Sequence, residues 1–500
     1  MRLKTVLAAS LSVFALAACA TAGDAPASQS ASAPAAAPEA AAKSPAKTPA
    51  KASYPEVQDE AAFRGLYKEL IEINTTASEG SCTNAAKAMQ ARLLAAGYPE
   101  SDTLVIAKPG WPQDGNLIAT LPGSDPSLKP IMLLAHIDVV EAKREDWERD
   151  PFVLSEEDGY FYARGASDDK AMAAIWTDAM VRYKQEGFKP QRSIKLALTC
   201  GEEGIGERVG VKWLVDTHPD LVDAAFALNE GAGGVIDEKT DAYLFNGVQA
   251  GEKLYQDFKL EVTNPGGHSS RPKKDNAIYH LSKALLSVGE MDFPIEFNDA
   301  TRTFFTRMAD LEKGPIAEAM RKAPSMDAEA IAALKEDPTY NALLHTTCVG
   351  TMVDAGHAPN ALPQRATANV NCRIFPGHSP EEIRQALIKG IADDQVSVTF
   401  ADEPETSAPA PKLDSAFMNP VESLTAEMFP GVPVVPAMAT GATDGRFLNA
   451  AGVPTYGVSG IFAAPGESNA HGLNEKMRVK SLMEGREFLY RLVKKYTVGE

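Results

Sequence analysis

Five short clusters of histidine and acidic residues stand along the chain, most of them directly after an apolar run. They are His136-Ile137-Asp138, Asp168-Asp169-Lys170, Glu202-Glu203, Asn229-Glu230-Gly231 and His471-Gly472-Leu473-Asn474-Glu475. Imidazole and carboxylate groups are the ligands that divalent metal ions of borderline and hard character prefer. Ligands just past strand ends fall in the crevice where open α/β sheets bind their ligands. The sequence therefore predicts one hydrolytic metal centre formed by these clusters.

The elements that must position these clusters alternate between strand-length apolar runs and longer amphipathic runs. The expected strands are 131–135, 194–199 and 224–228, and the expected helices are 171–183 and 209–215. This alternation requires crossover connections and predicts an α/β domain with a mainly parallel sheet. The same domain resumes near residue 413, with a helix over 415–428, a loop at 441–446, a strand at 454–458 and a last helix over 482–496.

The pattern changes after Gly251. Strands are expected at 255–262, 346–353, 366–374 and 396–400, and helices at 277–288 and 380–391. Their β-α-β-β-α-β order predicts a small α+β unit inserted into the larger domain. We expect the α/β domain to comprise 54–250 and 403–500 and the insert to comprise 251–402, with 295–341 as an extra helical elaboration.

The N-terminus has the pattern of a secretory signal over residues 1–18, because a basic start precedes an apolar stretch too short to span a bilayer. The sequence Leu-Ala-Ala before Cys19 resembles a bacterial lipobox and predicts a lipid anchor on that cysteine. An ordinary signal peptide cut near Ala18 or Ala20 is the alternative. Ala20 favours the outer membrane, which places the protein in the periplasm of the cell envelope. Residues 19–53 are almost wholly Ala, Pro, Ser and Lys and predict a disordered tether.

Composition limits the partners. A net charge of −18 argues against nucleic acid and anionic lipid as partners, so we expect the protein to contact the membrane only through the anchor on Cys19.

The stretch of about 445 residues after the tether is too long for one ordinary core and predicts two domains. Four further cysteines lack CxxC spacing, and isolated buried thiols are favoured over a disulfide. These are Cys82, Cys200, Cys348 and Cys372.

Taken together, the motifs resemble those of the M20 family of metallopeptidases, which includes carboxypeptidases, dipeptidases, aminoacylases and the succinyl-diaminopimelate desuccinylase. The resemblance covers about residues 60–498. It rests on Ala135-His136-Ile137-Asp138, Gly165-Ala166-Ser167-Asp168-Asp169-Lys170, Gly201-Glu202-Glu203-Gly204, Gly266-Gly267-His268-Ser269, Gly441-Ala442-Thr443-Asp444-Gly445-Arg446 and Ala470-His471-Gly472. The family implies a catalytic domain with two zinc ions, for which cobalt or manganese can substitute. It also implies that the insert is a ferredoxin-like lid that often mediates homodimerisation.

The resemblance implies five metal ligands. Asp168 would bridge the two ions, His136 and Glu230 would complete one site, and Glu203 and His471 would complete the other. The chemistry agrees, since a carboxylate has two oxygens and can hold two cations roughly 3.5 to 4 Å apart.

Glu202 is the expected general base. Beside the ligand Glu203 at a strand end, it would take a proton from a metal-bridging water and return it to the leaving amine. The alternative is solvated surface charge, the commoner role of adjacent acids, but the flanking glycines favour a cleft. Asp138 would fix the imidazole tautomer of His136. Cys200 departs from the family, many of whose members have an acidic or polar residue there.

The resemblance also implies site residues on the insert. His268, on a Gly-Gly turn, would hydrogen-bond the oxyanion, usually in the partner subunit of a dimer; a surface-loop histidine is the alternative. Asn360 and Arg373 would anchor the substrate, and the guanidinium of Arg373 suits a free C-terminal carboxylate. An internal ion pair is the alternative for Arg373. Thr443, in the α/β domain, would contact the substrate.

These expectations favour a lipid-anchored, zinc-dependent exopeptidase of the carboxypeptidase or dipeptidase kind that hydrolyses short peptides. An N-acyl amino acid amidohydrolase, meaning an aminoacylase or deacylase, is the enzymatic alternative, because the same centre cleaves any amide that fits its pocket. A tethered binding protein without activity is the alternative from another class. The presence of Glu202 argues against it, since binding alone does not need that carboxylate.

Overall fold

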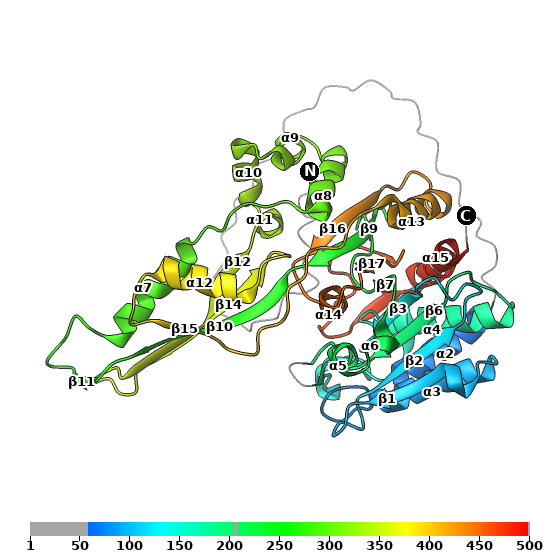
Figure 1. Cartoon of the computed structure of the whole chain (residues 1–500), viewed down its shortest axis with the longest axis horizontal. Coiled ribbons are helices and arrows are strands. Elements are labelled where there is room, and N and C mark those ends of the chain that lie inside the picture. The colour runs from blue at the N-terminus through cyan, green and yellow to red at the C-terminus, as the bar shows by residue number, and fades with distance from the viewer. Residues whose placement is uncertain (1–58, 205–207, 499–500) are drawn as a thin grey trace, which may run out of the picture.

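The computed structural model describes residues 59–204 and 208–498. A large α/β domain is built around a ten-stranded sheet, and a smaller four-stranded sheet with its own helices extends away from it along the long axis of the molecule (Figure 1). The predicted signal peptide, Cys19 and the tether lie outside the described residues. Within the described ranges, no helix combines the length and the apolar character that crossing a membrane would require.

The ten-stranded sheet has the order β1-β2-β6-β3-β7-β17-β9-β8-β18, and β16 also pairs with β9. The strands are β1 (Thr103–Ala107), β2 (Gly115–Leu121), β3 (Ile131–His136), β6 (Ile194–Thr199), β7 (Phe226–Asn229), β8 (Gly234–Ile236), β9 (Tyr243–Glu252), β16 (Val434–Ala439), β17 (Thr455–Gly457) and β18 (Phe462–Ala463). The neighbours β6, β3, β7 and β17 are parallel. The mainly parallel sheet expected from the sequence is therefore a mixed one, because β1 with β2 and β8 with β9 are joined by short connections that require antiparallel pairing.

The central strand β3 is buried on both faces. Ile131, Leu133 and Ala135 belong to one hydrophobic cluster, whereas Met132 and Leu134 belong to another on the opposite face. Successive side chains of a strand point to opposite faces, so a continuous apolar run is what a doubly covered strand needs.

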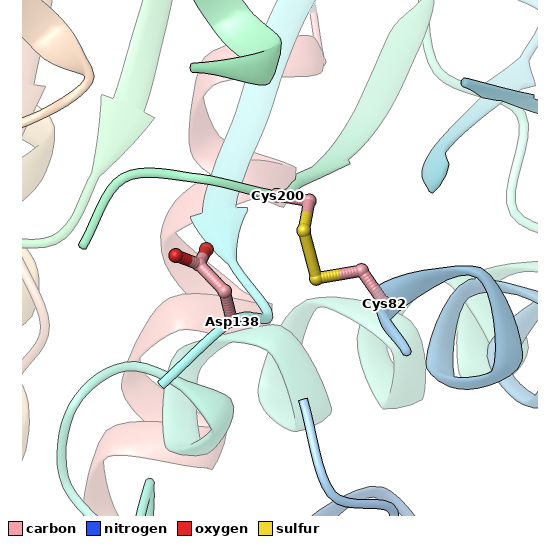
Figure 2. A group of neighbouring side chains, drawn as sticks. All are labelled: Cys82, Asp138 and Cys200. Atoms are coloured by element: carbon pink, nitrogen blue, oxygen red, sulfur yellow. A yellow bond between two sulfur atoms is a disulfide. The ribbon is translucent and has the colours of Figure 1, made fainter. Parts of the chain in front are cut away.

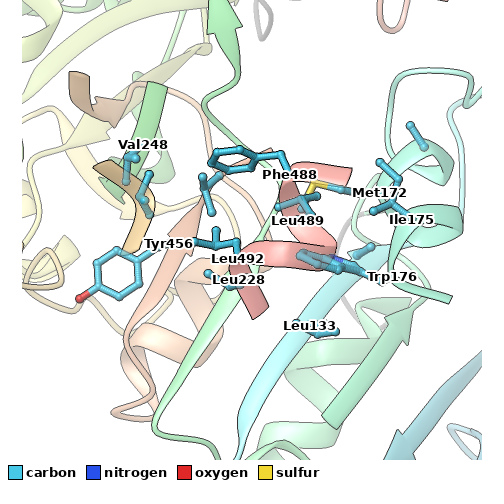
Figure 3. Packing of buried hydrophobic residues seen from close by; sticks show 14 of the residues in the cluster. Leu133, Met172, Ile175, Trp176, Leu228, Val248, Tyr456, Phe488, Leu489 and Leu492 are labelled. Carbon is cyan, nitrogen blue, oxygen red and sulfur yellow. The ribbon is translucent and has the colours of Figure 1, made fainter. Parts of the chain in front are cut away.

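Helices cover both faces of this sheet. Figure 3 shows Leu133 of β3, Trp176 and Leu492 within the first cluster. That cluster contains residues of α2 (Glu60–Glu72), α3 (Cys82–Ala95), α4 (Lys170–Gln185), α13 (Ser415–Met428) and α15 (Val479–Thr497). The second cluster contains residues of α5 (Gly210–Thr217) and α14 (Gly445–Ala450).

The smaller sheet is antiparallel and has the order β12-β14-β10-β15. Its strands are β10 (Leu254–Thr263), β12 (Thr347–Ala355), β14 (Arg365–Ile374) and β15 (Ser397–Phe400), and α7 (Ala277–Glu290) and α12 (Pro380–Ile391) share its core. The predicted β-α-β-β-α-β order is confirmed. A short pair, β11 (Gly267–His268) with β13 (Ala361–Leu362), lies at the end remote from the large sheet (Figure 1).

The expected elaboration at 295–341 is helical, but it packs on the larger domain. It comprises α8 (Asp299–Leu311), α9 (Pro315–Lys322), α10 (Ala328–Lys335) and α11 (Pro338–Leu344). Phe304, Phe305 and Met308 of α8 belong to the same cluster as the large sheet. In space this segment therefore thickens the α/β domain, although in sequence it interrupts the insert.

The expectation of isolated thiols is wrong, because the four described cysteines form two disulfides. Cys82 pairs with Cys200 across a separation of 118 residues, with the Cα atoms 6.0 Å apart. Cys348 and Cys372 stand opposite each other on β12 and β14 and pair with the Cα atoms 4.1 Å apart. Spacing along the chain did not show either pair, since the fold brings the partners together.

Candidate metal centre

Three neighbouring strands place four of the predicted residues at one edge of the large sheet. They are His136, the last residue of β3, then Glu202 and Glu203 shortly after β6, and Glu230 directly after β7. Because β6, β3 and β7 are adjacent and parallel, their carboxyl ends meet at this edge. The antiparallel strands lie outside this group and do not alter the edge.

Two further residues reach the same point from loops. Asp168 precedes α4, and His471 precedes the short strand β19 (Lys476–Arg478). The Oδ1 atom of Asp168 lies 3.1 Å from Nε2 of His136, and its Oδ2 atom lies 3.2 Å from Nε2 of His471. The two carboxylate oxygens therefore face two different imidazoles, as a residue that bridges two ions must.

The ligand atoms form two groups of three that share Asp168. In one, Oε2 of Glu230 lies 3.9 Å from Nε2 of His136. In the other, Oε1 of Glu203 lies 2.9 Å from Nε2 of His471. His471 is exposed whereas the other four are largely buried, so the cluster opens to solvent on the His471 side.

The donor set fits divalent metal ions such as zinc. In each group of three, nitrogen and carboxylate oxygen donors lie within 4.8 Å of one another, and these are the donors that zinc sites use. The Oε1 atom of Glu230 is buried and has no hydrogen-bond partner among the described residues. Burial raises the pKa of Glu230 well above its usual value, and the neighbouring acids Glu202, Asp169 and Asp168 add to this. Cations among these groups would offset the mutual repulsion of the carboxylates.

Asp138 holds the segment that carries the two glutamates. Its Oδ1 and Oδ2 atoms accept hydrogen bonds from the backbone N–H groups of Glu202 at 3.3 Å and Glu203 at 3.1 Å. Figure 2 shows this carboxylate directed toward the segment that leaves Cys200. Nδ1 of His136 lies 3.1 Å from the carbonyl oxygen of Asp138 and 3.7 Å from its Oδ1 atom. The nearer partner of the imidazole is thus the backbone of Asp138, while the side chain orients the next strand end.

Glu202 lies within the cluster without being part of either group that shares Asp168. One of its carboxylate oxygens is within 4.8 Å of ligand atoms of His136 and Glu203. Burial raises the pKa of Glu202 well above its usual value, and the acids Asp444 and Glu203 raise it further, whereas His136 opposes the shift. A raised pKa favours a general base that works near neutral pH.

Thr443 lines a small pocket together with Asn229 and Glu230, and it is only 1 % exposed. Its hydroxyl accepts a hydrogen bond from Nδ2 of Asn229 at 3.1 Å, and its backbone N–H donates to Oε2 of Glu252 at 2.6 Å. Burial raises the pKa of Glu252 to about 7. Glu252, at the end of β9, lines the same small pocket together with Glu230 and Thr443, and the sequence analysis did not single it out.

Arg373 lies where the insert meets the loop at 441–446. Its Nη1 atom donates to the carbonyl oxygen of Thr440 at 3.3 Å, and its guanidinium carbon lies 4.7 Å from the ring centroid of Tyr255. Among the described residues it forms no ion pair with an acid, so the alternative of an internal ion pair is not realised there. The half-buried guanidinium retains donors that can bind an anion.

His268 and Asn360 are not brought to the metal cluster within one chain. Both are exposed, and Nδ1 of His268 accepts a hydrogen bond from the backbone N–H of Ser270 at 3.1 Å. The pair β11 and β13 lies at the far end of the insert, well away from β3, β6 and β7 (Figure 1). A role for His268 at a metal centre therefore requires a second subunit.

Comparisons with known proteins agree with this architecture. The sequence matches the family described as peptidase family M20/M25/M40 over residues 132–495. It is 31 % identical over 383 residues to the N-fatty-acyl-amino acid synthase/hydrolase PM20D1 of Mus musculus, covering 75 % of each chain. It is 29 % identical over 385 residues to the probable carboxypeptidase S-like 2 of Dictyostelium discoideum, covering 76 % of this chain and 74 % of that protein.

A solved structure shows the same fold. The M20 family metallo-carboxypeptidase Sso-CP2 from Sulfolobus solfataricus superposes with a TM-score of 0.65 at 17 % identity, covering 87 % of this chain and 99 % of that one. The matched segment holds the strand ends and loops that form the cluster. The chain therefore belongs to peptidase family M20/M25/M40 and is a hydrolase of the M20 type.

Proposed function

We propose that the enzyme hydrolyses the amide bond between an acyl group and an amino acid that carries a free α-carboxylate. Arg373 is the observation that carries this proposal, because its guanidinium has no acidic partner among the described residues and lies beside the loop at 441–446. A planar guanidinium can bind a carboxylate through two parallel hydrogen bonds. An exopeptidase that releases the C-terminal residue of a short peptide uses this recognition, and it is the candidate that the sequence favours.

An N-acyl amino acid hydrolase is the second candidate, and one of the relatives supports it. The protein of Mus musculus is named an N-fatty-acyl-amino acid synthase/hydrolase. An N-acyl amino acid presents the same amide and the same carboxylate as a peptide C-terminus. The two candidates therefore differ only in the acyl side, for which the described residues assign no binding group.

The proposed centre holds two zinc ions. His136, Glu230 and Asp168 would hold one ion, and Glu203, His471 and Asp168 the other. When bound, such ions lower the pKa of water and polarise the amide carbonyl.

The groups of the chain would then move the protons. Glu202 takes a proton from the attacking water as its oxygen bonds to the acyl carbon. When the carbon–nitrogen bond breaks, Glu202 returns that proton to the leaving amine. Arg373 binds the α-carboxylate of the amino acid that is released. This contact positions the scissile amide beside Glu202.

We also propose a homodimer formed through the edge strand β12. This strand pairs only with β14 in the described sheet, and it exposes Val349, Met352 and Val353 by 58 %, 73 % and 66 %. An unpaired edge with exposed apolar side chains is a template for pairing with another strand. Joining two such edges would continue the small sheet across both subunits, and the end that carries His268 would then serve the metal centre of the other subunit.

We propose the periplasm as the compartment, with a lipid anchor on Cys19. The two disulfides support an oxidising environment, in which such bonds form and persist. Membrane fractionation of wild-type protein and of a Cys19→Ala variant tests the anchor. We expect the variant to move to the soluble periplasmic fraction, and wild-type protein found wholly soluble would contradict the anchor.

The substrate proposal is tested with matched pairs of compounds. Each acyl amino acid or dipeptide is compared with the same compound carrying a C-terminal carboxamide, and released amine is measured with zinc and after chelation. Hydrogen bonds to charged groups contribute about 1.5 to 3 kcal/mol, so the carboxamide should be cleaved about 10- to 100-fold less efficiently. Equal cleavage of both members of a pair would contradict carboxylate recognition. The acyl groups that are accepted decide between peptidase and acylase.

A further inference from the structure

The two metal ligands on loops need support that the strand-end ligands do not. His136, Glu203 and Glu230 come from ends of hydrogen-bonded strands, whereas Asp168 and His471 come from segments without such pairing. A metal site holds its geometry only where surrounding groups fix the ligand side chains and their backbone. The support for these two loops must therefore lie elsewhere.

Glu475 supplies the first half of that support. Its side chain is completely buried. The Oε1 atom accepts hydrogen bonds from the backbone N–H groups of Ser167 at 2.7 Å and Asp168 at 3.0 Å. The Oε2 atom accepts from the backbone N–H of Gly165 at 3.0 Å. One carboxylate from the His471 loop thus accepts three hydrogen bonds from backbone N–H groups of the Asp168 loop.

Arg164 supplies the second half in the opposite direction. It lies in the Asp168 loop, is 2 % exposed, and donates from Nη1 to Oε2 of Glu475 at 2.9 Å. Its Nη2 atom donates to the carbonyl oxygen of Gly472 at 3.0 Å and reaches that of His471 at 3.4 Å. Each loop therefore sends one charged side chain to hold the backbone of the other.

A purely stabilising role does not account for this arrangement. A buried ion pair adds little stability compared with apolar residues of the same size, because removing both charges from water costs about as much as their attraction returns. The hydrogen bonds of this pair go instead to the backbone beside the two metal ligands. Its distinctive effect is to fix the separation of Asp168 and His471.

We propose that Arg164 and Glu475 are positioning residues that set the relative placement of Asp168 and His471, and thereby the affinity of the metal position formed with Glu203. This inference rests on the proposed metal centre. The other position also uses Asp168, but His136 and Glu230 stand on neighbouring strand ends that the ion pair does not touch. Loss of the ion pair should therefore weaken the two positions unequally.

The experiment measures zinc stoichiometry and the two dissociation constants by competition with a chromogenic chelator. The variant Glu475→Gln keeps the size of the side chain but replaces one acceptor oxygen with an NH₂ group, which cannot accept hydrogen bonds from the backbone N–H groups or from Arg164. Wild-type protein should bind two ions. Changing groups that orient metal ligands typically weakens metal binding 10- to 100-fold, and we expect a loss of that size at one of the two positions with a much smaller change at the other. A variant with both constants unchanged would overturn the proposal.

A matched control distinguishes positioning from general stability. Asp178 on α4 and Arg486 on α15 form another buried ion pair in the same domain, with Oδ2 of Asp178 2.7 Å from Nε of Arg486. Asp178→Asn should lower the melting temperature but leave both zinc constants unchanged. If it weakens zinc binding as Glu475→Gln does, the effect is general loosening and the positioning role is wrong.

A second variant covers failure of Glu475→Gln to fold. Arg164→Lys keeps both charges but replaces the planar fork with a single ammonium group, which cannot hold Glu475 and the carbonyl oxygen of Gly472 in the same geometry. It should show the same unequal loss of zinc affinity at the two positions. Dissociation constants unchanged from those of wild-type protein would again overturn the proposal. Wild-type protein that binds fewer than two ions would instead contradict the metal centre itself, so the two failures are distinguishable.

Discussion

Glu202 and Glu203 are neighbours in the chain but face different partners. Oε1 of Glu203 lies 2.9 Å from Nε2 of His471, whereas the Glu202 carboxylate lies within 4.8 Å of ligand atoms of His136 and Glu203 and outside the two groups that share Asp168. Asp138 accepts hydrogen bonds from the backbone N–H groups of both residues, and these bonds restrict the backbone conformation of both. At the scale of single residues, contacts with one carboxylate thus hold the backbone of both the proposed ligand and the proposed general base.

Glu202→Gln should keep its metal ions and lose turnover. The amide has the size of the acid but cannot accept the proton of water, and a positioned acid–base group contributes about 10²- to 10⁴-fold. Zinc content and rate are measured on the same preparation. Glu203→Gln is the matched control and should lose metal. Near-normal turnover of Glu202→Gln, or loss of its metal, would remove the proposed role.

Glu252 should make stability depend on pH in a particular direction. Burial raises its folded pKa to about 7, above the usual value of 4.5. Between these values the folded protein binds more protons than the unfolded chain, so the stability contributed by this group falls as pH rises and is lost above pH 7. Glu252→Gln cannot ionise. From pH 5 to 8 it should therefore gain stability relative to wild-type protein, by up to about 3 kcal/mol. The free energies of unfolding of both proteins are measured by urea denaturation. A difference between them that stays constant from pH 5 to 8 would contradict the raised pKa of Glu252.

Several elements meet at the metal centre, and a disulfide ties one of them down. Cys82 begins α3, and Cys200 immediately follows β6, two residues before Glu202. The backbone N–H of Cys200 also donates to Oδ1 of Asn116 on β2 at 3.0 Å. The strand end that carries Glu202, the proposed general base, is therefore held by a covalent link to a helix and a hydrogen bond to a neighbouring strand.

Removing this disulfide should destabilise the protein more than removing the other one. Closing a longer loop removes more entropy from the unfolded chain. The separations are 118 and 24 residues, so the loop-entropy relation gives the paired substitution Cys82→Ala and Cys200→Ala about 1.4 kcal/mol more effect than Cys348→Ala and Cys372→Ala. Free energies of unfolding from urea titrations of both double variants test this order. A larger loss for the shorter loop would contradict it.

The whole molecule separates two groups that the proposed reaction brings together. The metal cluster follows β3, β6 and β7 of the large domain, whereas β11, which contains His268, lies at the far end of the insert (Figure 1). The exposed edge of β12 offers a way to combine them in a symmetric pair, in which each subunit completes the site of the other.

Mixing two inactive variants should restore part of the activity. In a heterodimer of Glu202→Gln and His268→Ala chains, one of the two sites contains both native groups. Random exchange produces such heterodimers in half of the population, so about a quarter of wild-type activity is expected. Each variant alone, carried through the same exchange, is the control. Absence of recovery after verified exchange would mean that the site is completed within one chain.

Local pattern determined much of this protein. The helix at 380–391 and the strand at 194–199 have the predicted bounds, because apolar periodicity and capping residues act within a few neighbours. The clusters after the central strands also predicted which side chains lie close together, because the carboxyl ends of parallel strands meet at the same edge of the sheet. Residue type and order along the chain were sufficient for both.

Only the tertiary structure decided the rest, because it depends on contacts between distant segments. The two disulfides, the mixed sheet and the packing of α8 on the large core all join residues that local pattern does not connect. Glu475 belonged to one of the five clusters but had no assigned role, and in the fold its carboxylate accepts hydrogen bonds from the backbone of a loop some 300 residues earlier. A sequence shows which side chains are present, whereas the fold decides which backbone groups they reach.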